Sequence, residues 1–295
     1  MLNVVKASGV VEPFSDEKVL SSIKRAGIPK ELQSKVLAHI KQKAFPNITT
    51  KEIYQHILEY LDKSETPFAK TRYSLKDAIM QLGPTGYPFE DFIAKLLTEQ
   101  GYHTSTRQTL KGRCITHEID IIAAKNGKTA SIEAKFHNNH GTRTEVQVAL
   151  YTKSRFDDIK EYNTLDEAWI ITNTKITQDA IGFAGCSKMK VISWNYPAGN
   201  SLRDIIEKTG LHPITALSSL TANHKKKLLD NHIVICKDIC RNSYLLNMLN
   251  LTKKEKARVL DEIEYTCKLK VEDRPKPAIN KPHNYIFTSP TTPSV

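Results

Sequence analysis

The chain has 295 residues, which is long enough for two or three domains. Of these residues, 40% are hydrophobic and 25% are charged, a composition typical of globular proteins. Lysine and arginine number 43 against 32 acidic residues, and the net charge of +11 favours a polyanionic partner such as nucleic acid. No apolar run is long enough to cross a membrane and no secretory h-region follows Met1, so we expect a cytoplasmic protein without a membrane partner. The five cysteines are scattered and lack a second metal-binding pair, which favours free thiols over zinc or disulfides.

The first 82 residues have the pattern of a separate small domain, made of one hairpin and about four helices. Residues 2–14 carry two short valine-rich runs around a turn at Ser8-Gly9. Helices are expected after Ser15 and after Thr49, both favourable N-caps, with another helix between them. A fourth apolar stripe over residues 68–82 ends at a Gly-Pro pair, where we place the domain boundary.

These residues resemble the ATP-cone, a small nucleotide-sensing domain found at the front of ribonucleotide reductases and some repressors. The resemblance is carried by Val5-Lys6, Gly9, Glu12-Pro13-Phe14, Lys18 and Arg72-Tyr73-Ser74-Leu75. It implies a regulatory ligand, ATP or dATP, in a pocket formed by four residues: Val5, Lys6, Glu12 and Lys18. The two lysines are point charges that suit phosphate groups. A helical bundle with surface lysines is the alternative.

Residues 83–215 alternate between helices and strands. After a stiff linker at residues 83–86, the pattern predicts a helix that carries Glu90 in its first turn. The expected elements that follow are a strand at 102–107, a hairpin, a helix at 144–160, a strand at 168–172, a helix at 177–186, a strand at 190–194 and a helix capped by Ser201.

The hairpin spans residues 117–136 and turns at Asn126-Gly127, the strongest short-range hairpin signal in a sequence. With a two-residue turn, paired residue numbers sum to 253, which places Asp120 opposite Glu133 and Glu118 opposite Lys135. Alternation also puts Glu133 and Lys135 on one face, with Ile119, Ile121, Ile132 and Phe136 expected on the other. Two facing carboxylates destabilise a hairpin unless a cation lies between them, which predicts a hard metal ion such as Mg²⁺. A solvated hairpin face with a Glu118–Lys135 ion pair is the alternative.

This part of the chain resembles the PD-(D/E)XK nuclease core of restriction endonucleases and Holliday-junction resolvases, with the best local match to the Mrr type. The resemblance is carried by Gly86-Tyr87-Pro88-Phe89-Glu90, Glu118-Ile119-Asp120 and Glu133-Ala134-Lys135. Many Mrr-type proteins have Gln where Glu133 stands, so the Glu-x-Lys motif is closer to the resolvases. The implied core is a mixed sheet with the order α-βββ-α-β.

The resemblance implies roles that fit the chemistry of phosphodiester hydrolysis. Asp120 and Glu133 would hold Mg²⁺ or Mn²⁺, and Lys135 would orient the attacking water and contact the phosphate. Glu90 would hold a metal-bound water. On the following helix, Gln147, Tyr151 and Arg155 repeat every four positions and so share one face. Gln147 would position Lys135, whereas Tyr151 and Arg155 would contact DNA.

The remainder of the chain changes character near residue 216. Residues 216–270 predict a small helical domain with lysine-rich segments that loosely resembles helix-hairpin-helix DNA-binding modules; a solvated basic face is an equal alternative. Residues 271–295 are rich in proline and poor in apolar residues, which predicts an extended or disordered tail.

The sequence therefore predicts a multi-domain α/β protein and a nucleotide-regulated, divalent-metal-dependent DNA endonuclease for foreign or modified DNA. The alternatives are a Holliday-junction or repair nuclease and a non-catalytic nucleotide-sensing regulator that binds DNA. DNA and a purine nucleotide are the expected partners, and homo-oligomerisation is left open.

Overall fold

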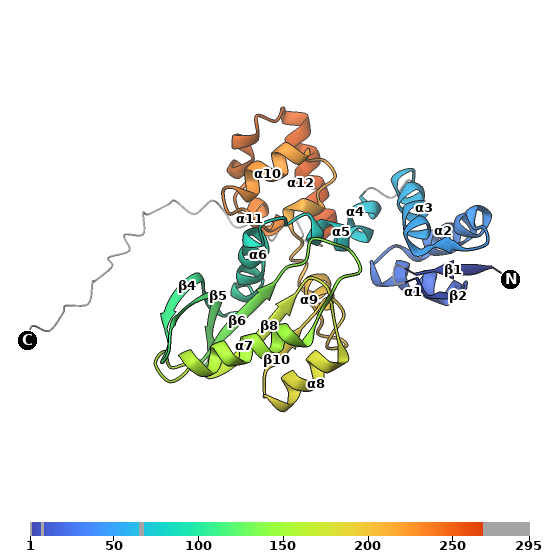
Figure 1. Cartoon of the computed structure of the whole chain (residues 1–295). Coiled ribbons are helices and arrows are strands. Elements are labelled where there is room, and N and C mark those ends of the chain that lie inside the picture. Colours follow the sequence, from blue (N-terminus) through green and yellow to red (C-terminus); the bar gives the residue numbers. More distant parts are fainter. Residues whose placement is uncertain (1, 7–8, 65–67, 268–295) are drawn as a thin grey trace, which may run out of the picture.

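A computed structural model describes residues 2–6, 9–64 and 68–267 (Figure 1). The expected turn residue Ser8 and the expected tail at 271–295 lie outside the described residues. Within the described ranges, every helix is too short or too polar to cross a bilayer.

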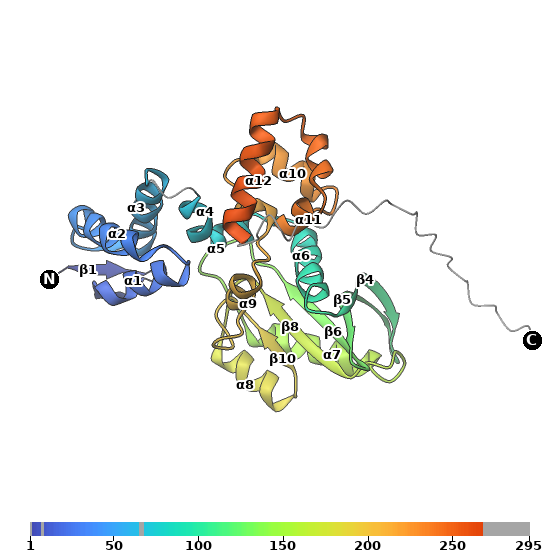
Figure 2. The ribbon, with the colours of Figure 1, turned by 180° about the vertical axis from the view of Figure 1, so that it is seen from behind.

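The N-terminal unit combines a small sheet with three helices and stands to one side of the molecule (Figures 1 and 2). Its elements are β1 (Asn3–Val5), β2 (Val11–Pro13), α1 (Asp16–Arg25), α2 (Lys30–Lys43), β3 (Ile48–Thr49) and α3 (Thr50–Asp62). The strands β1 and β2 form the expected antiparallel hairpin, and β3 adds in parallel to β1. The two-residue β3 has no periodicity of its own, so the sequence pattern does not reveal it.

Helix caps in this unit form as the sequence predicts. The Ser15 hydroxyl accepts the amide of Lys18, and Thr49 and Glu52 form a reciprocal capping box. Each cap satisfies main-chain donors that a helix terminus leaves without a partner. These local contacts fix where α1 and α3 begin.

The stripe expected on one helix at residues 68–82 instead lies on two short helices, α4 (Ala69–Tyr73) and α5 (Leu75–Met80). Ala69 packs in the N-terminal core, whereas Leu75, Ile79 and Leu82 are buried in the core of the central unit. The predicted boundary after residue 82 therefore does not match the division of the cores. Helical periodicity identifies an apolar face and does not identify the core that buries it.

The central unit is built on a five-stranded mixed sheet with the strand order β10-β8-β6-β5-β4. Its main elements are α6 (Tyr87–Thr98), β4 (His103–Lys111), β5 (Thr116–Lys125), β6 (Lys128–Lys135), α7 (Val146–Ile159), β8 (Glu167–Thr172), α8 (Gln178–Cys186), β10 (Lys190–Ile192) and α9 (Leu202–Thr209). The first three strands are antiparallel, and β6, β8 and β10 are parallel. This is the expected α-βββ-α-β order. A further parallel pair, β7 (Arg143–Thr144) with β9 (Lys175–Ile176), is too short to be seen in the sequence pattern.

Helices cover both faces of this sheet (Figures 1 and 2). Phe89, Phe92 and Ile93 of α6 pack on one face together with Leu202 and Ile206 of α9. A second core joins α7 and α8 to the opposite face of β8 and β10. The sheet is therefore the middle layer of three, and its β5–β6 hairpin is held between helices.

The C-terminal unit is helical, as the sequence predicts. It comprises α10 (Ala222–Leu229), α11 (Cys236–Arg241) and α12 (Lys253–Cys267), with 3-10 turns η1 (Ile214–Ala216) and η2 (Ser243–Leu249). These elements enclose their own apolar core. The buried carboxylate of Glu262 accepts hydrogen bonds from Thr71 at 2.6 Å and from the main chain of Ser218 and Ser219, which ties this unit to α4.

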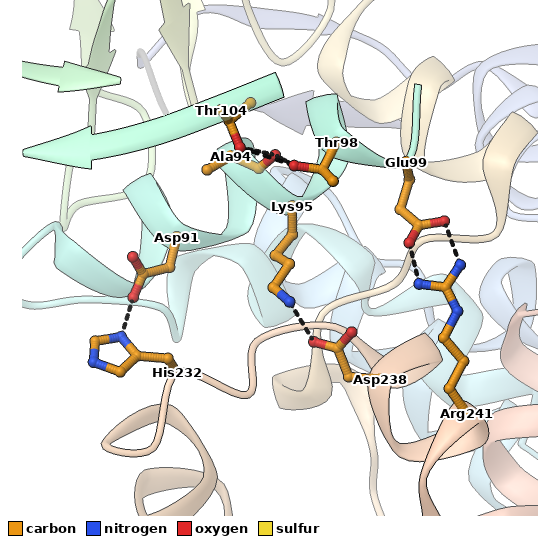
Figure 3. A network of polar contacts seen from close by, with 9 residues as sticks. All are labelled: Asp91, Ala94, Lys95, Thr98, Glu99, Thr104, His232, Asp238 and Arg241. Atoms are coloured by element: carbon orange, nitrogen blue, oxygen red, sulfur yellow. Dashed lines mark hydrogen bonds and ion pairs between the residues drawn. The ribbon is translucent and has the colours of Figure 1, made fainter. Parts of the chain in front are cut away.

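Charged side chains dock the C-terminal unit on the outer side of α6 (Figure 3). Asp91 accepts from the ring Nδ1 of His232 at 2.8 Å, and Lys95 lies 3.5 Å from Asp238. Glu99 pairs with Arg241, and also with Lys237 at 2.6 Å. Since α6 also carries Glu90, this interface fixes the helix that supplies one of the candidate site residues.

We predict that a fragment of residues 69–267 is more stable than a fragment of residues 83–267. Without residues 69–82, the central core loses Leu75, Ile79 and Leu82, whose burial is expected to contribute about 3–6 kcal/mol in total. Urea unfolding followed by circular dichroism measures the difference. Equal midpoints for the two fragments would show that α5 contributes nothing to the central core and that the predicted boundary after residue 82 is right.

Candidate active site

The β5–β6 hairpin has the predicted turn and register. Asn126 and Gly127 have φ values of 52° and 73°, and the ladder runs from Lys125–Lys128 to Ile121–Ile132. Each pair sums to 253, so the turn chemistry alone sets the register. The strand β6 continues as the centre of the sheet because β8 pairs with its other edge.

The hairpin ladder ends where the candidate carboxylates begin. The Oδ2 atom of Asp120 accepts the main-chain N–H of Ala134 at 2.8 Å. A side-chain carboxylate, not a main-chain carbonyl, thus accepts the Ala134 amide, just beyond the last ladder pair, Ile121–Ile132. Neither of the two expected pairs, Asp120 with Glu133 and Glu118 with Lys135, belongs to the regular β5–β6 ladder. On the other edge of β5, Glu118 is paired with Thr109 of β4. Asp120 nevertheless lies near Glu133, because it binds the amide of the next residue, Ala134, and the charge of Glu133 raises its pKa.

The backbone is also irregular on the other side of Asp120. Arg107 on β4 has a φ of 52°, a left-handed conformation rare for a large side chain, and the regular β4–β5 pairs skip this position. Ile119 then packs with Ile159 and Leu165, while Ile121 faces the core under α6. The prediction that Ile119 shares the face of Ile121 is wrong, because strict alternation fails at Asp120.

Arg155 lies against Glu133. Its Nη2 donates to Glu133 Oε2 at 2.5 Å and its Nη1 donates to the carbonyl of Glu118 at 2.9 Å. The guanidinium also stacks 4.5 Å from the ring centroid of Tyr151, and only 10% of the Arg155 side chain is exposed. The sequence predicts a phosphate contact for Arg155, whereas in the structure this cation neutralises a candidate metal ligand. Tyr151 is 59% exposed and open to a ligand.

Glu90 enters the site from α6 and meets an arginine that the sequence pattern does not identify. Arg107 donates to Glu90 at 3.1 Å and to Asp91 at 2.8 Å. Burial and the charge of Asp120 raise the pKa of Glu90 to about 7, against the opposing effect of Arg107. The only sequence signal for Arg107 is its place on a strand beside the hairpin, which many arginines share.

The three carboxylates form one electrostatic unit. Burial first and Glu133 second raise the pKa of Asp120 to about 6, despite the Ala134 amide and Arg155, which lower it. Asp120 in turn raises the pKa of Glu90. The negative charge of this unit is therefore incompletely compensated by the two arginines at its edges.

Lys135 and Gln147 complete the set predicted from sequence. Lys135 is half-buried on β6, two residues after Glu133 and opposite Thr172 of β8. Among the described residues, its ammonium group has no hydrogen bond or ion pair. Gln147 is exposed in the first turn of α7, and no described contact links it to Lys135.

The donor atoms fit a hard divalent cation that is completed by substrate. Among the described residues, no three His, Cys, Asp or Glu side chains are placed together as a metal cage. Mg²⁺ in phosphoryl-transfer sites commonly uses one or two carboxylates, with waters and phosphate oxygens as the remaining ligands. Asp120 and Glu133 provide such a pair, and the raised pKa of Asp120 is the mark of a site that attracts positive charge.

The histidines near the hairpin have structural partners. His117 lies 2.9 Å from Asp158, His137 lies 3.0 Å from Thr144, and His140 lies 3.4 Å from Asp77. These contacts fasten the loops on either side of the hairpin, which favours a positioning role over DNA contact.

A cavity of about 620 Å³ lies in the N-terminal unit, where the sequence predicts nucleotide binding. Lys6 and Lys18 lie at its wall and pair with Glu12 at 2.7 and 2.8 Å. Val4 lines the cavity, whereas the expected Val5 does not, because the alternation of β1 turns Val5 away. The stacked rings of Tyr54 and Tyr73, 5.3 Å apart, form a further part of the wall.

Two family models match the chain. Residues 83–197 match a family described as restriction endonuclease, of the Mrr catalytic type, and residues 212–267 match one described as AF1548-like, C-terminal. The ATP-cone resemblance of residues 1–82 stays a prediction.

Two individual proteins are also similar to the chain. An uncharacterized protein of Archaeoglobus fulgidus is 33% identical over 171 residues, which are 58% of this chain and 97% of that protein. The crystal structure of a protein of unknown function, AF1548, superimposes with a TM-score of 0.54 at 31% identity, covering 62% of this chain and 99% of the other.

We predict that Asp120→Asn stabilises the metal-free protein and that the gain grows as the pH rises. A raised pKa in the folded state means that the stabilising contribution is present below the unfolded pKa of about 3.9 and is lost as the pH rises through about 6. Asparagine keeps an oxygen for the Ala134 amide and removes the charge. The expected gain at neutral pH is on the order of 1 kcal/mol, measured by urea unfolding in EDTA.

The matched control for this prediction is Asp166→Asn, because the Asp166 carboxylate also accepts one main-chain amide, from Thr129 at 2.7 Å. An Asp120→Asn variant less stable than wild type across the range from about pH 4 to 8 would mean that Asp120 is held ionised by its neighbours. The acid cluster would then carry no excess negative charge.

Proposed function

Because the chain belongs to the AF1548-like family and has a restriction endonuclease-like domain, we propose that it is a divalent-metal-dependent DNA endonuclease regulated by a purine nucleotide. The proposed reaction is hydrolysis of phosphodiester bonds in foreign or modified DNA. The net charge of +11 supports a polyanionic substrate.

The observation that carries this proposal is the position of Asp120. Its carboxylate is fixed by the Ala134 amide at 2.8 Å, beside Glu133 and within electrostatic reach of Glu90. Structural carboxylates usually gain stability from paired cations and have lowered pKa values. Here the pKa values of Asp120 and Glu90 are raised to about 6 and about 7, as expected of a cluster arranged for function.

In the proposed site, Asp120 and Glu133 hold Mg²⁺ or Mn²⁺. When bound, the metal supplies an activated water and neutralises charge on the phosphate. Lys135, which is free of ion pairs among the described residues, contacts the phosphate oxygens and orients the water. Glu90, with a pKa of about 7, can hold or release a proton near neutral pH, and Arg107 fixes its carboxylate in place.

Arg155 has a distinct place in this scheme. It pairs with Glu133 at 2.5 Å and so occupies the side of the carboxylate that faces α7. Tyr151, stacked on the same guanidinium and 59% exposed, offers a flat surface for a base or sugar. Gln147, one turn earlier on α7, is the proposed partner of Lys135 once DNA is bound.

The N-terminal cavity supports nucleotide regulation. Its two lysines suit a triphosphate, and its stacked tyrosines suit a purine base. Tyr54 donates to Asp77 of α5 at 2.7 Å, and Asp77 also contacts His140 in the loop that follows β6. A ligand in the cavity can therefore shift groups that pack near the strand bearing Lys135.

The ion pair between Arg155 and Glu133 favours one alternative, a non-catalytic nucleotide-sensing regulator that binds DNA. In that case the guanidinium permanently takes the place of the metal at Glu133. A Holliday-junction or repair nuclease is the alternative substrate assignment, which the Glu133-Ala134-Lys135 motif supports. Incubation of plasmid and branched DNA with Mg²⁺ or Mn²⁺, with and without ATP or dATP, separates the three.

We predict that Asp120→Ala, Glu133→Ala and Lys135→Ala each reduce metal-dependent cleavage by at least about 100-fold, because groups that act as a unit give large, non-additive losses. DNA binding measured in Ca²⁺ by fluorescence anisotropy should change little. The matched control is Lys128→Ala, at the far end of the same strand and exposed.

Near-normal cutting by any of the three site variants would remove that residue from the proposed site. If the wild-type protein binds plasmid and branched DNA but cleaves neither, the non-catalytic regulator is favoured.

We predict that Lys18→Ala weakens the binding of ATP or dATP to the full chain about tenfold, as expected for the loss of one charge-assisted hydrogen bond. Calorimetry measures the affinity, and Lys41→Ala serves as control because Lys41 pairs with Asp16 outside the cavity lining. If neither nucleotide binds the wild-type chain, the N-terminal unit is not a nucleotide sensor.

A further inference from the structure

A second, smaller cavity lies where the N-terminal unit, the helices α4 and α5, and the central unit meet. Its volume is about 150 Å³. The lining residues that bear on its chemistry are Arg72, Tyr73, Lys76, Trp194, Arg203 and Glu207. Three of these are basic and one is acidic, so the cavity carries an excess of positive charge.

The central feature of this cavity is a buried guanidinium without a full set of partners. Arg72 is only 7% exposed, and its Nε and Nη2 atoms are buried with no hydrogen-bond partner. Its Nη1 makes one long contact, 3.4 Å, to the carbonyl of Gly27, and its Cζ lies 5.7 Å from the Tyr265 ring. A buried charge whose donors have no partners destabilises the folded state unless an anion compensates it.

The position of Arg72 is held by its surroundings. A Cβ atom on Gly27 would come within 3.1 Å of the guanidinium, so the glycine leaves room for it to lie against the chain. Thr71, the preceding residue, is fixed by its hydrogen bond to Glu262. The guanidinium of Arg72, a residue of the cavity lining, is therefore held in one place against Gly27.

Two further cations face the same space from different elements. Lys76 of α5 lies 4.7 Å from the ring centroid of Trp194 and donates to the carbonyl of Asn173, and burial lowers its pKa to about 8. Arg203 of α9 makes one loose ion pair, 3.5 Å, with Asp204. Glu207 is the one acidic residue of the lining, so the lining side chains carry a net charge of about +2 at neutral pH, and Asp204 beside Arg203 offsets part of it.

We propose that this cavity is a binding site for a phosphoryl group. The charge of a phosphate dianion is opposite to that of the lining. Its oxygens can accept hydrogen bonds from the two unpartnered N–H groups of Arg72 and from the side chains of Lys76 and Arg203. Arginine is suited to such planar, two-pronged recognition of phosphate. The site is distinct from the proposed nuclease centre and does not depend on it.

The phosphoryl group has two chemical sources. Ser22, Tyr54 and Tyr73 line both this cavity and the larger N-terminal cavity, so the two spaces adjoin across the tyrosine pair. The occupant is either free inorganic phosphate or the phosphate end of a nucleotide whose base lies in the larger cavity. In both cases it links α1 of the N-terminal unit to α5 and α9, which pack in the central core.

The test is calorimetric melting of the full chain in a phosphate-free buffer at constant ionic strength, with inorganic phosphate, pyrophosphate, adenosine or ATP added. Saturating phosphate or pyrophosphate should raise the melting temperature by about 3 °C or more, since a ligand that binds only the folded state stabilises it. Arg72→Met should abolish this rise and, without phosphate, melt at or above the wild-type temperature because an unpaired buried charge has been removed.

Arg203→Gln is the second variant, in case Arg72→Met does not fold, and should weaken the phosphate response about tenfold in concentration. Arg258→Met on the exposed face of α12 is the matched control and should keep the full response. A rise with ATP that needs Arg72, with no rise for phosphate or pyrophosphate alone, assigns the nucleotide source. A rise that survives in both Arg72→Met and Arg203→Gln, or no rise with phosphate, pyrophosphate or ATP, overturns the proposal.

Discussion

The hydrogen bond from the Ala134 amide to the Asp120 carboxylate is the contact on which the candidate site depends. An antiparallel ladder would normally use main-chain partners at this point. Because a side chain accepts the amide instead, the β5–β6 ladder stops at Ile121–Ile132, and the carboxylate is fixed beside Glu133. The same irregularity turns Ile119 toward Ile159 and coincides with the left-handed conformation of Arg107.

Three elements then bring charge to this point. The helix α6 contributes Glu90, β4 contributes Arg107 and α7 contributes Arg155. The arginines offset part of the negative charge and hold two of the carboxylates in fixed positions. They do not offset all of it, because the pKa values of Asp120 and Glu90 stay raised. A folded protein keeps such a costly arrangement when a cation or a proton is part of its function.

Local chemistry explains what the sequence could predict. The Asn-Gly turn, the caps at Ser15, Thr49 and Ser201, and the order of helices and strands in the central unit all follow from contacts between near neighbours. Register within the hairpin follows from the turn, which is why the pairs from Lys125–Lys128 to Ile121–Ile132 could be predicted from sequence. The ladder ends before Asp120 and Glu133, where the side chain of Asp120 binds the Ala134 amide.

Contacts between distant residues explain the rest. The ion pair of Arg155 with Glu133 joins positions 22 residues apart, and the contact of Thr71 with Glu262 joins positions 191 apart. Helical periodicity identifies the apolar face of residues 75–82 and does not predict that the central core buries this face. The place of Arg72 at a charged cavity depends on the N-terminal and central units meeting at α4 and α5, which no local pattern encodes.

The most direct test of the account is the binding of Mn²⁺ to the full chain, measured by calorimetry in the presence of a short uncleaved DNA duplex. We predict saturable binding that is lost in the Asp120→Asn, Glu133→Gln double variant. Binding should be retained in the Glu167→Gln variant, because Glu167 is an acidic residue on the neighbouring strand β8. Equal Mn²⁺ binding by the wild type and the double variant would contradict the assignment of these two carboxylates as the metal ligands.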